Sequence, residues 1–306
     1  MSIARRLLLR ASHSAWLAEQ LRRRTFVRRA VRRFMPGEEL ADALTAAAEL
    51  RTSGIGSLLT QLGENITSRA EADAVRDHYL GVLDQVQARG LPSQISVKLT
   101  QLGLDVDRAA CLTRLRALVA RAAEHHATLW IDMEDSTYTD VTLDTFKRMR
   151  AEQHNVGVAL QAYLRRTPAD LEALLPLGPT IRLVKGAYNE PASVAFPRKH
   201  DVDEQYYQLA GTLLEHTKRG TRPVLGTHDL GLIGRIRARA AELRAPPGSF
   251  EVHMLFGIRT AAQRALAAEG VPVRVLISYG RAWFAWYMRR LAERPANVWF
   301  VLRSLV

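Results

Sequence analysis

The sequence contains a single cysteine, Cys111, among 306 residues. One thiol cannot form a disulfide within the chain, and it cannot build a zinc site of the kind that needs several cysteines. The nine histidines and the carboxylates show no spacing typical of metal ligands either. We therefore expect no metal and a protein suited to a reducing compartment.

Long apolar runs and low-complexity segments are also missing. No apolar stretch approaches the roughly 20 residues that a helix needs to span a bilayer. The apolar residues 7–9 are too few for the core of a secretory signal peptide. With 47% hydrophobic residues, the chain can bury one large core. We expect a soluble or peripheral protein, in the cytoplasm or attached to the inner face of the cell membrane.

Acidic residues are nearly absent from the start of the chain. Residues 1–33 contain ten arginines and one acid, Glu19, so about nine of the twelve net positive charges lie there. Apolar residues recur between the arginines at helical spacing, which predicts basic amphipathic helices. Such helices bind anionic membranes or nucleic acid, cover a domain, or direct a protein to an organelle. We divide the chain into these N-terminal helices, residues 1–45, and a catalytic domain, residues 46–306.

Beyond residue 45, short apolar runs alternate with amphipathic helical stretches. Eight runs have the length and composition of buried strands: residues 56–59, 95–99, 128–132, 156–161, 180–185, 223–228, 250–255 and 273–277. Strands that alternate with helices form a parallel sheet, and eight such units predict an α/β fold, a (β/α)8 TIM-like barrel with extra N-terminal helices. An open doubly wound sheet is disfavoured, because no glycine-rich phosphate loop follows an early strand.

Polar side chains occupy the ends of five successive predicted strands, where barrel enzymes place their chemistry. These residues are Lys98, Asp132, Gln161, Arg182, Lys185, Thr227 and His228. A charged side chain inside a barrel costs desolvation energy unless it binds a partner. The alternatives are an ion pair between Lys98 and Asp132 that only supports the barrel, and a structural hydrogen bond for His228. Five such strands in a row favour a binding site.

Two adjacent arginines, Arg289 and Arg290, follow a run of aromatic residues that begins at Trp283. Arginine binds a carboxylate through two parallel charge-assisted hydrogen bonds. Taken alone, the segment could be an exposed basic helix end, with Glu293 paired to Arg289. Combined with the strand-end residues, it favours a site for a small amino acid with an apolar body.

Six motifs occur in order along the chain: residues 97–103, 131–135, 160–164, 182–188, 227–229 and the segment that contains Arg289 and Arg290. They resemble the proline dehydrogenase family, most of all its short monofunctional bacterial members. The resemblance covers residues 24–306 and includes residues 26–44, which argues against a removed transit peptide. It implies FAD bound at the barrel mouth, hydride transfer from C5 of L-proline to flavin N5, the product Δ1-pyrroline-5-carboxylate, and a membrane quinone that receives the electrons.

The resemblance assigns cofactor-binding roles to residues on several strands. It places Arg182 near flavin N5, where a cation stabilises the negative charge of the reduced ring. Together with Asp132, Arg182 is a catalytic candidate. Gln161 addresses the polar edge of the flavin, and Met133 offers backbone contacts. The residues implied at the phosphates, the ribityl chain and the adenosine are Lys185, Gly186, Ala187, Thr227 and His228.

The implied substrate site combines cations with apolar walls. Arg289 and Arg290 clamp the carboxylate of L-proline, and Lys98 is a third cation that pairing with Asp132 would orient. Glu64 corresponds to a family acid that pairs with the arginine near N5 and acts as a gate. The walls of the ring pocket are Tyr188, Leu255, Leu276 and Trp286.

Three residues depart from the proline-specific pattern. Leu276 and Trp286 stand where that pattern has tyrosines, and Ser278 replaces a proline. These changes reshape the ring pocket and leave the cofactor and carboxylate residues intact. The substrate is therefore either L-proline, or a ring-modified proline or other cyclic imino acid.

A protein of a different class is the remaining alternative: a non-catalytic barrel whose basic N-terminus binds a membrane or nucleic acid. Retention of Lys98, Asp132 and Arg182 disfavours it, because a buried charge without a ligand is costly. For the enzyme we expect no nucleic-acid partner. We expect residues 1–33 to contact an anionic membrane surface that carries the quinone.

Overall fold

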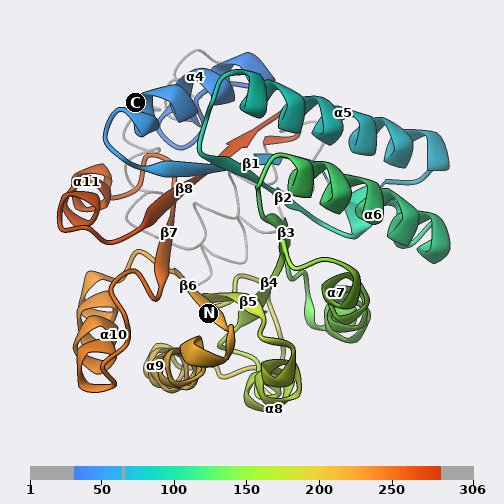
Figure 1. Cartoon of the computed structure of the whole chain (residues 1–306). Coiled ribbons are helices and arrows are strands. Elements are labelled where there is room, and N and C mark those ends of the chain that lie inside the picture. The colour runs from blue at the N-terminus through green and yellow to red at the C-terminus, as the bar shows by residue number, and fades with distance from the viewer. Residues whose placement is uncertain (1–30, 64–65, 284–306) are drawn as a thin grey trace, which may run out of the picture.

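The computed structural model describes residues 31–63 and 66–283, and its parallel strands close into a barrel that helices surround (Figure 1). The strands in barrel order are β1 (Gly56–Gln61), β2 (Ser93–Val97), β3 (Leu129–Ile131), β4 (Val156–Gln161), β5 (Thr180–Val184), β6 (Arg222–Gly226), β7 (Glu251–Leu255) and β8 (Val273–Tyr279). Each strand pairs in parallel with the next, and β8 pairs with β1 to close the barrel. The predicted (β/α)8 fold is confirmed.

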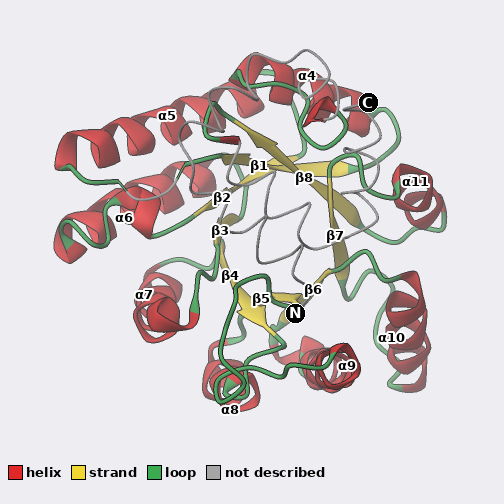
Figure 2. Ribbon diagram, turned by 180° about the vertical axis from the view of Figure 1, so that it is seen from behind, coloured by secondary structure: helices red, strands yellow, loops and turns green. Residues whose placement is uncertain are grey.

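The helices lie outside the strands when the molecule is viewed from either side (Figure 1, Figure 2). They are α4 (Leu40–Arg51), α5 (Arg69–Ala88), α6 (Arg108–Glu124), α7 (Thr139–Glu152), α8 (Thr167–Leu174), α9 (Lys199–Glu215), α10 (Leu230–Glu242) and α11 (Thr260–Ala268). Helix α4 runs through residue 45, where the sequence analysis placed the start of the barrel domain, and packs against β1 and β8. The basic segment at residues 1–30 lies outside the described residues.

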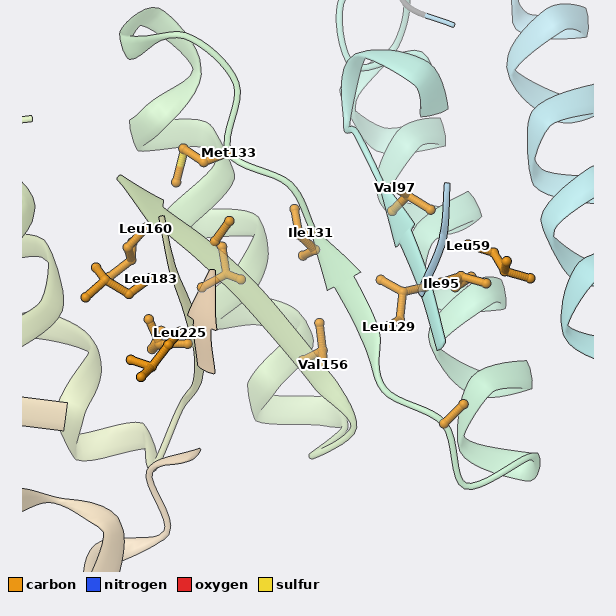
Figure 3. Packing of buried hydrophobic residues seen from close by; sticks show 14 of the residues in the cluster. Leu59, Ile95, Val97, Leu129, Ile131, Met133, Val156, Leu160, Leu183 and Leu225 are labelled. Carbon is orange, nitrogen blue, oxygen red and sulfur yellow. The ribbon is translucent and has the colours of Figure 1, made fainter. Parts of the chain in front are cut away.

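The main hydrophobic core fills the space between the strands and the helices. Alternate strand residues point outward into it, such as Ile95 and Val97 of β2 and Leu129 and Ile131 of β3 (Figure 3). The intervening residues point into the barrel, where a smaller apolar cluster lies. That cluster comprises Leu58, Trp130, Val224 and the partly buried Leu276. Because the outward positions supply most of the apolar burial, polar residues are tolerated at several inward positions.

Capping residues fix where helices begin at the mouth of the barrel. Asp229 follows β6, and its carboxylate accepts a hydrogen bond from the backbone N–H of Leu232 at 3.2 Å, which caps α10. Asp107 caps α6 in the same way, by accepting from the backbone N–H groups of Ala109 and Ala110. Helix starts and strand ends therefore meet at one face of the barrel.

In residues 31–63 and 66–283, no helix is long and apolar enough to cross a membrane. The same residues contain no group of three or more His, Cys, Asp or Glu side chains arranged to hold a metal ion. Cys111 is buried on α6, and burial raises the pKa of its thiol to about 12. This thiol is therefore a packing group at neutral pH.

Candidate active site

Arg182 lies at the centre of the candidate site. It is in the middle of β5, its side chain points into the barrel, and the residue is only 5% exposed. Its guanidinium pairs with Asp132, the residue after β3, and donates a hydrogen bond to Ser96 Oγ of β2 at 3.0 Å. Ser96 Oγ in turn donates to Asp132 Oδ1 at 2.8 Å. Three strands thus supply one closed triangle of hydrogen bonds.

The Arg182 guanidinium is a buried charge that its neighbours only partly compensate. Burial lowers the pKa of Arg182, whereas the charge of Asp132 and its hydrogen bond raise that pKa. Arginine nevertheless stays protonated in proteins, so the positive charge is retained. The guanidinium carbon also lies 5.0 Å from the ring centroid of Trp130, within the range of a cation–π contact. Such a cation can stabilise negative charge on a bound group.

Lys98 directly follows β2 and is half-buried. The expected ion pair between Lys98 and Asp132 is wrong: among the described residues, Asp132 pairs with Arg182 instead, and its Oδ1 also accepts from Ser96. Among the described residues, the Lys98 ammonium has no hydrogen bond or ion pair within contact distance. Its charge acts on Glu134: burial raises the pKa of Glu134, and Thr100 and Lys98 lower it in part. The ammonium group is thus available to an anionic ligand.

Gln161 ends β4 with its amide buried. The amide nitrogen Nε2 donates to the backbone oxygen of Glu134 at 3.1 Å and lies 3.5 Å from the backbone oxygen of Met133. The amide oxygen Oε1 has no hydrogen-bond partner within the described part of the chain. A buried acceptor without a donor is costly. This oxygen is therefore suited to accept an N–H from a ligand.

Lys185, the residue after β5, is held by two carboxylates. Its Nζ lies 2.5 Å from Asp203 Oδ1 of α9 and 2.9 Å from Asp229 Oδ2. The hydrogen bond from Lys185 lowers the pKa of Asp229. Burial alone would raise the pKa of Asp203, but hydrogen bonds from Lys185 and Lys199 outweigh it, so that pKa lies below its usual value. The ammonium is thus fixed in place, and its contact with cofactor phosphates stays a prediction.

Gly186, in the loop after β5, has a backbone conformation and a close neighbour that require glycine. Its φ is +115°, and a Cβ at this position would lie 2.2 Å from Cδ1 of the Tyr163 ring. Any other residue would therefore strain the backbone and displace the ring. Ala187 is exposed and Tyr188 is half-buried, so the loop after β5 reaches the surface of the protein.

Thr227 and His228 follow β6. The hydroxyl of Thr227 accepts a hydrogen bond from the backbone N–H of Asp229 at 3.2 Å. His228 Nε2 accepts from the backbone N–H of Leu255 at 2.8 Å and thereby ties the end of β6 to the end of β7. This bond is the structural role that the sequence left open for His228, and a role at the cofactor stays a prediction.

Leu276 of β8 lies inside the barrel, packed in the cluster with Leu58, Trp130 and Val224. Leu255 is its register partner on β7. The two leucines supply apolar surface next to the polar groups. Four predicted site residues lie outside the described part of the chain, namely Glu64, Trp286, Arg289 and Arg290.

Three buried residues of this site were not selected from the sequence. Ser96 and Trp130 each lie two positions before a selected residue, so the alternation of a strand places them on the same inward face. Glu134 accepts hydrogen bonds from the backbone N–H and the hydroxyl of Thr100, at 3.2 and 2.7 Å. Strand alternation was the available signal for Ser96 and Trp130, whereas the partner of Glu134 depends on the loop geometry after β2.

The chain is similar in sequence to several known proteins. A family model described as proline dehydrogenase matches residues 43–303. The chain is 38% identical over 275 residues to proline dehydrogenase 1 of Bacillus subtilis subsp. natto, which covers 90% of each chain. It is also 38% identical over 279 residues to proline dehydrogenase of Deinococcus radiodurans, with 90% of this chain and 89% of the other covered.

A solved structure of proline utilization A from Bdellovibrio bacteriovorus, inactivated by N-propargylglycine, has a TM-score of 0.81 and 22% identity to this chain. The match covers 94% of this chain and 36% of that longer protein. At this identity the likeness concerns the fold, and it agrees with the closed barrel. The family match and the identity to two relatives over most of their length show that the chain belongs to the proline dehydrogenase family.

Proposed function

We propose that this protein oxidises L-proline or a close cyclic relative, with FAD as hydride acceptor and a membrane quinone as final electron acceptor. The observation that carries the proposal is the buried pair of Arg182 and Asp132 inside the barrel. The adjacent strand β4 ends at Gln161, whose Oε1 lacks a partner among the described residues. The names of the relatives, proline dehydrogenases, support proline as the substrate.

The described residues fit FAD in three respects. Gln161 Oε1 can accept an N–H from the polar edge of the flavin ring. Arg182 would supply a fixed cation that stabilises negative charge on the reduced ring. The loop after β5 is exposed at Ala187 and contains Lys185, whose ammonium could contact the cofactor phosphates. When bound, FAD supplies the two-electron acceptor that no side chain of this protein provides.

The residues of the chain itself would bind the substrate and exclude water. The ammonium of Lys98 would attract the carboxylate of proline, together with Arg289 and Arg290 from outside the described residues. Leu255 and Leu276 would pack against the ring and remove water from it. These contacts would hold the ring so that the hydrogen that leaves C5 as hydride faces the cofactor.

Leu276 favours a second candidate substrate. Its side chain lies in an apolar cluster, and the tyrosine hydroxyl of the proline-specific pattern is absent at this position. A ring that carries a substituent or has six members would have fewer steric clashes with leucine than with tyrosine at this position. Contacts of this size change selectivity by about 1–3 kcal/mol. A ring-modified proline or other cyclic imino acid is therefore the second candidate.

The experiment is an assay of protein purified in the presence of FAD. L-proline, its ring-modified relatives and D-proline are each supplied with a soluble quinone, and the imine product is identified by mass. We expect turnover of L-proline or a close relative in proportion to bound FAD, and little turnover of D-proline. If protein saturated with FAD oxidises no cyclic imino acid, or if turnover persists without FAD, the proposal is wrong.

A further inference from the structure

Trp130 lies directly against the catalytic candidate Arg182. It is the second residue of β3, it is only 2% exposed, and its side chain belongs to the cluster inside the barrel. The guanidinium carbon of Arg182 lies 5.0 Å from the indole centroid. The sequence analysis assigned no role to this tryptophan.

The indole of Trp130 is fixed by contacts on its other edges. Its Nε1 donates a hydrogen bond to Gln94 Oε1 of β2 at 2.6 Å. The ring of His253 meets it edge to face, with centroids 5.3 Å apart and an interplanar angle of 75°. His253 is anchored in turn, because its Nε2 lies 2.7 Å from Glu251 Oε1. A ring held in this way cannot rotate without breaking a buried hydrogen bond.

Gly157 of β4 leaves the space that the indole occupies. A Cβ at Gly157 would lie 2.7 Å from Cε3 and Cζ3 of Trp130. The backbone of Gly157 lies within a regular strand and is not among the positive-φ residues, so the indole and not the backbone requires glycine here. The neighbouring strand is therefore adapted to this tryptophan.

We propose that Trp130 is a positioning residue that holds the guanidinium of Arg182 in place inside the barrel. Asp132 and Ser96 bind Arg182 through hydrogen bonds, and the indole adds a surface that limits its movement. The effect of Trp130 on flavin chemistry rests on the proposed function, whereas the contact between Trp130 and Arg182 does not. If Trp130 only filled the barrel, its loss would lower stability without a specific effect on Arg182.

The first experiment compares Trp130→Leu with Leu58→Ala, which removes packing from the same cluster but leaves the indole in contact with Arg182. The flavin midpoint potential and kcat are measured on protein with equal FAD content. We expect Trp130→Leu to lower the midpoint potential and to reduce kcat by about tenfold or more, because displaced catalytic groups cost such factors. Leu58→Ala should keep the wild-type potential. Trp130→Phe keeps an aromatic face and should recover most of kcat. Equal potentials in Trp130→Leu and Leu58→Ala would overturn the proposal.

The second experiment needs no flavin. Urea unfolding of the protein without FAD is followed for wild type, Trp130→Leu, Arg182→Met and the double variant. Arg182→Met and the double variant both leave Asp132 without its partner. The cost of that loss therefore cancels when the effect of Trp130→Leu is compared between the two backgrounds of this double-mutant cycle. We expect Trp130→Leu to cost less stability when Arg182 is already methionine. Additive losses would overturn the proposed contact. A failure of the proposed function would appear separately, as wild-type protein whose bound flavin is reduced by no cyclic imino acid.

Discussion

At the scale of single residues, the site depends on one carboxylate oxygen that serves two donors. Asp132 Oδ1 accepts from Ser96 and from Arg182, and the Arg182 side chain is more deeply buried than that of Asp132. We expect Asp132→Asn to lower the free energy of unfolding by about 3 kcal/mol, because it leaves a buried cation without its counter-charge. Chemical denaturation of the protein without cofactor measures this loss.

Ser96→Ala is the matched control for Asp132→Asn. It removes a neutral hydrogen-bond donor from the same oxygen and a neutral acceptor from Arg182, and it keeps the ion pair intact. The expected cost is about 1 kcal/mol. Equal losses in the two variants would mean that the charge of Asp132 does not matter to Arg182.

Leu276 is the residue on which substrate choice depends in this account. We expect Leu276→Tyr to raise the preference for L-proline over ring-modified relatives by about tenfold, since a tyrosine would crowd the far edge of the ring. The measurement is kcat/KM on protein with matched FAD content. Leu276→Phe adds the ring without the hydroxyl and so separates size from hydrogen bonding. A wild-type protein that already prefers L-proline by more than about tenfold would contradict the assigned role.

At the scale of elements, the loop after β5 depends on Gly186. We expect Gly186→Ala to destabilise the protein by about 1–3 kcal/mol, because of its positive φ and the clash with the Tyr163 ring. Affinity for FAD should fall as well if the loop borders the cofactor site as proposed. Thermal unfolding with and without FAD measures both effects.

Gly211→Ala is the control for Gly186→Ala. Gly211 lies in α9, and a Cβ there would meet nothing within 4 Å. Alanine should be neutral or stabilise the helix by up to about 1 kcal/mol. Should both variants unfold at the same temperature, the loop tolerates a side chain and the argument from Gly186 is wrong.

The elements could be predicted from the sequence better than the contacts between them. All eight strands were expected with bounds within two residues of those observed, because short apolar runs separated by amphipathic helices specify alternation directly. The partner of Asp132 was not expected, since Lys98 and Arg182 were both predicted at strand ends and only three-dimensional geometry decides which of them meets the carboxylate. Likewise, the sequence placed Lys185 at a strand end but did not indicate its pairing with Asp203 on the following helix.

At the scale of the whole molecule, charge is concentrated at the start of the chain, where residues 1–30 lie outside the described residues. Residues 1–33 carry about nine net positive charges, and each basic side chain near an anionic membrane can add about 1 kcal/mol of binding. We expect the protein to sediment with anionic vesicles at low salt and to be released at high salt. Zwitterionic vesicles are the control. Absence of binding to anionic vesicles at low salt would contradict a membrane role for this segment.

The most direct test of the whole account is an anaerobic titration of the purified protein, loaded with FAD, with L-proline and its ring-modified relatives. The account predicts a yellow protein whose oxidised flavin absorption disappears as the cyclic imino acid is added. It also predicts slower bleaching in Arg182→Lys, which keeps the charge but loses the guanidinium nitrogen that contacts both Asp132 and Ser96. Protein that holds FAD but stays yellow with every cyclic imino acid would contradict the central claim.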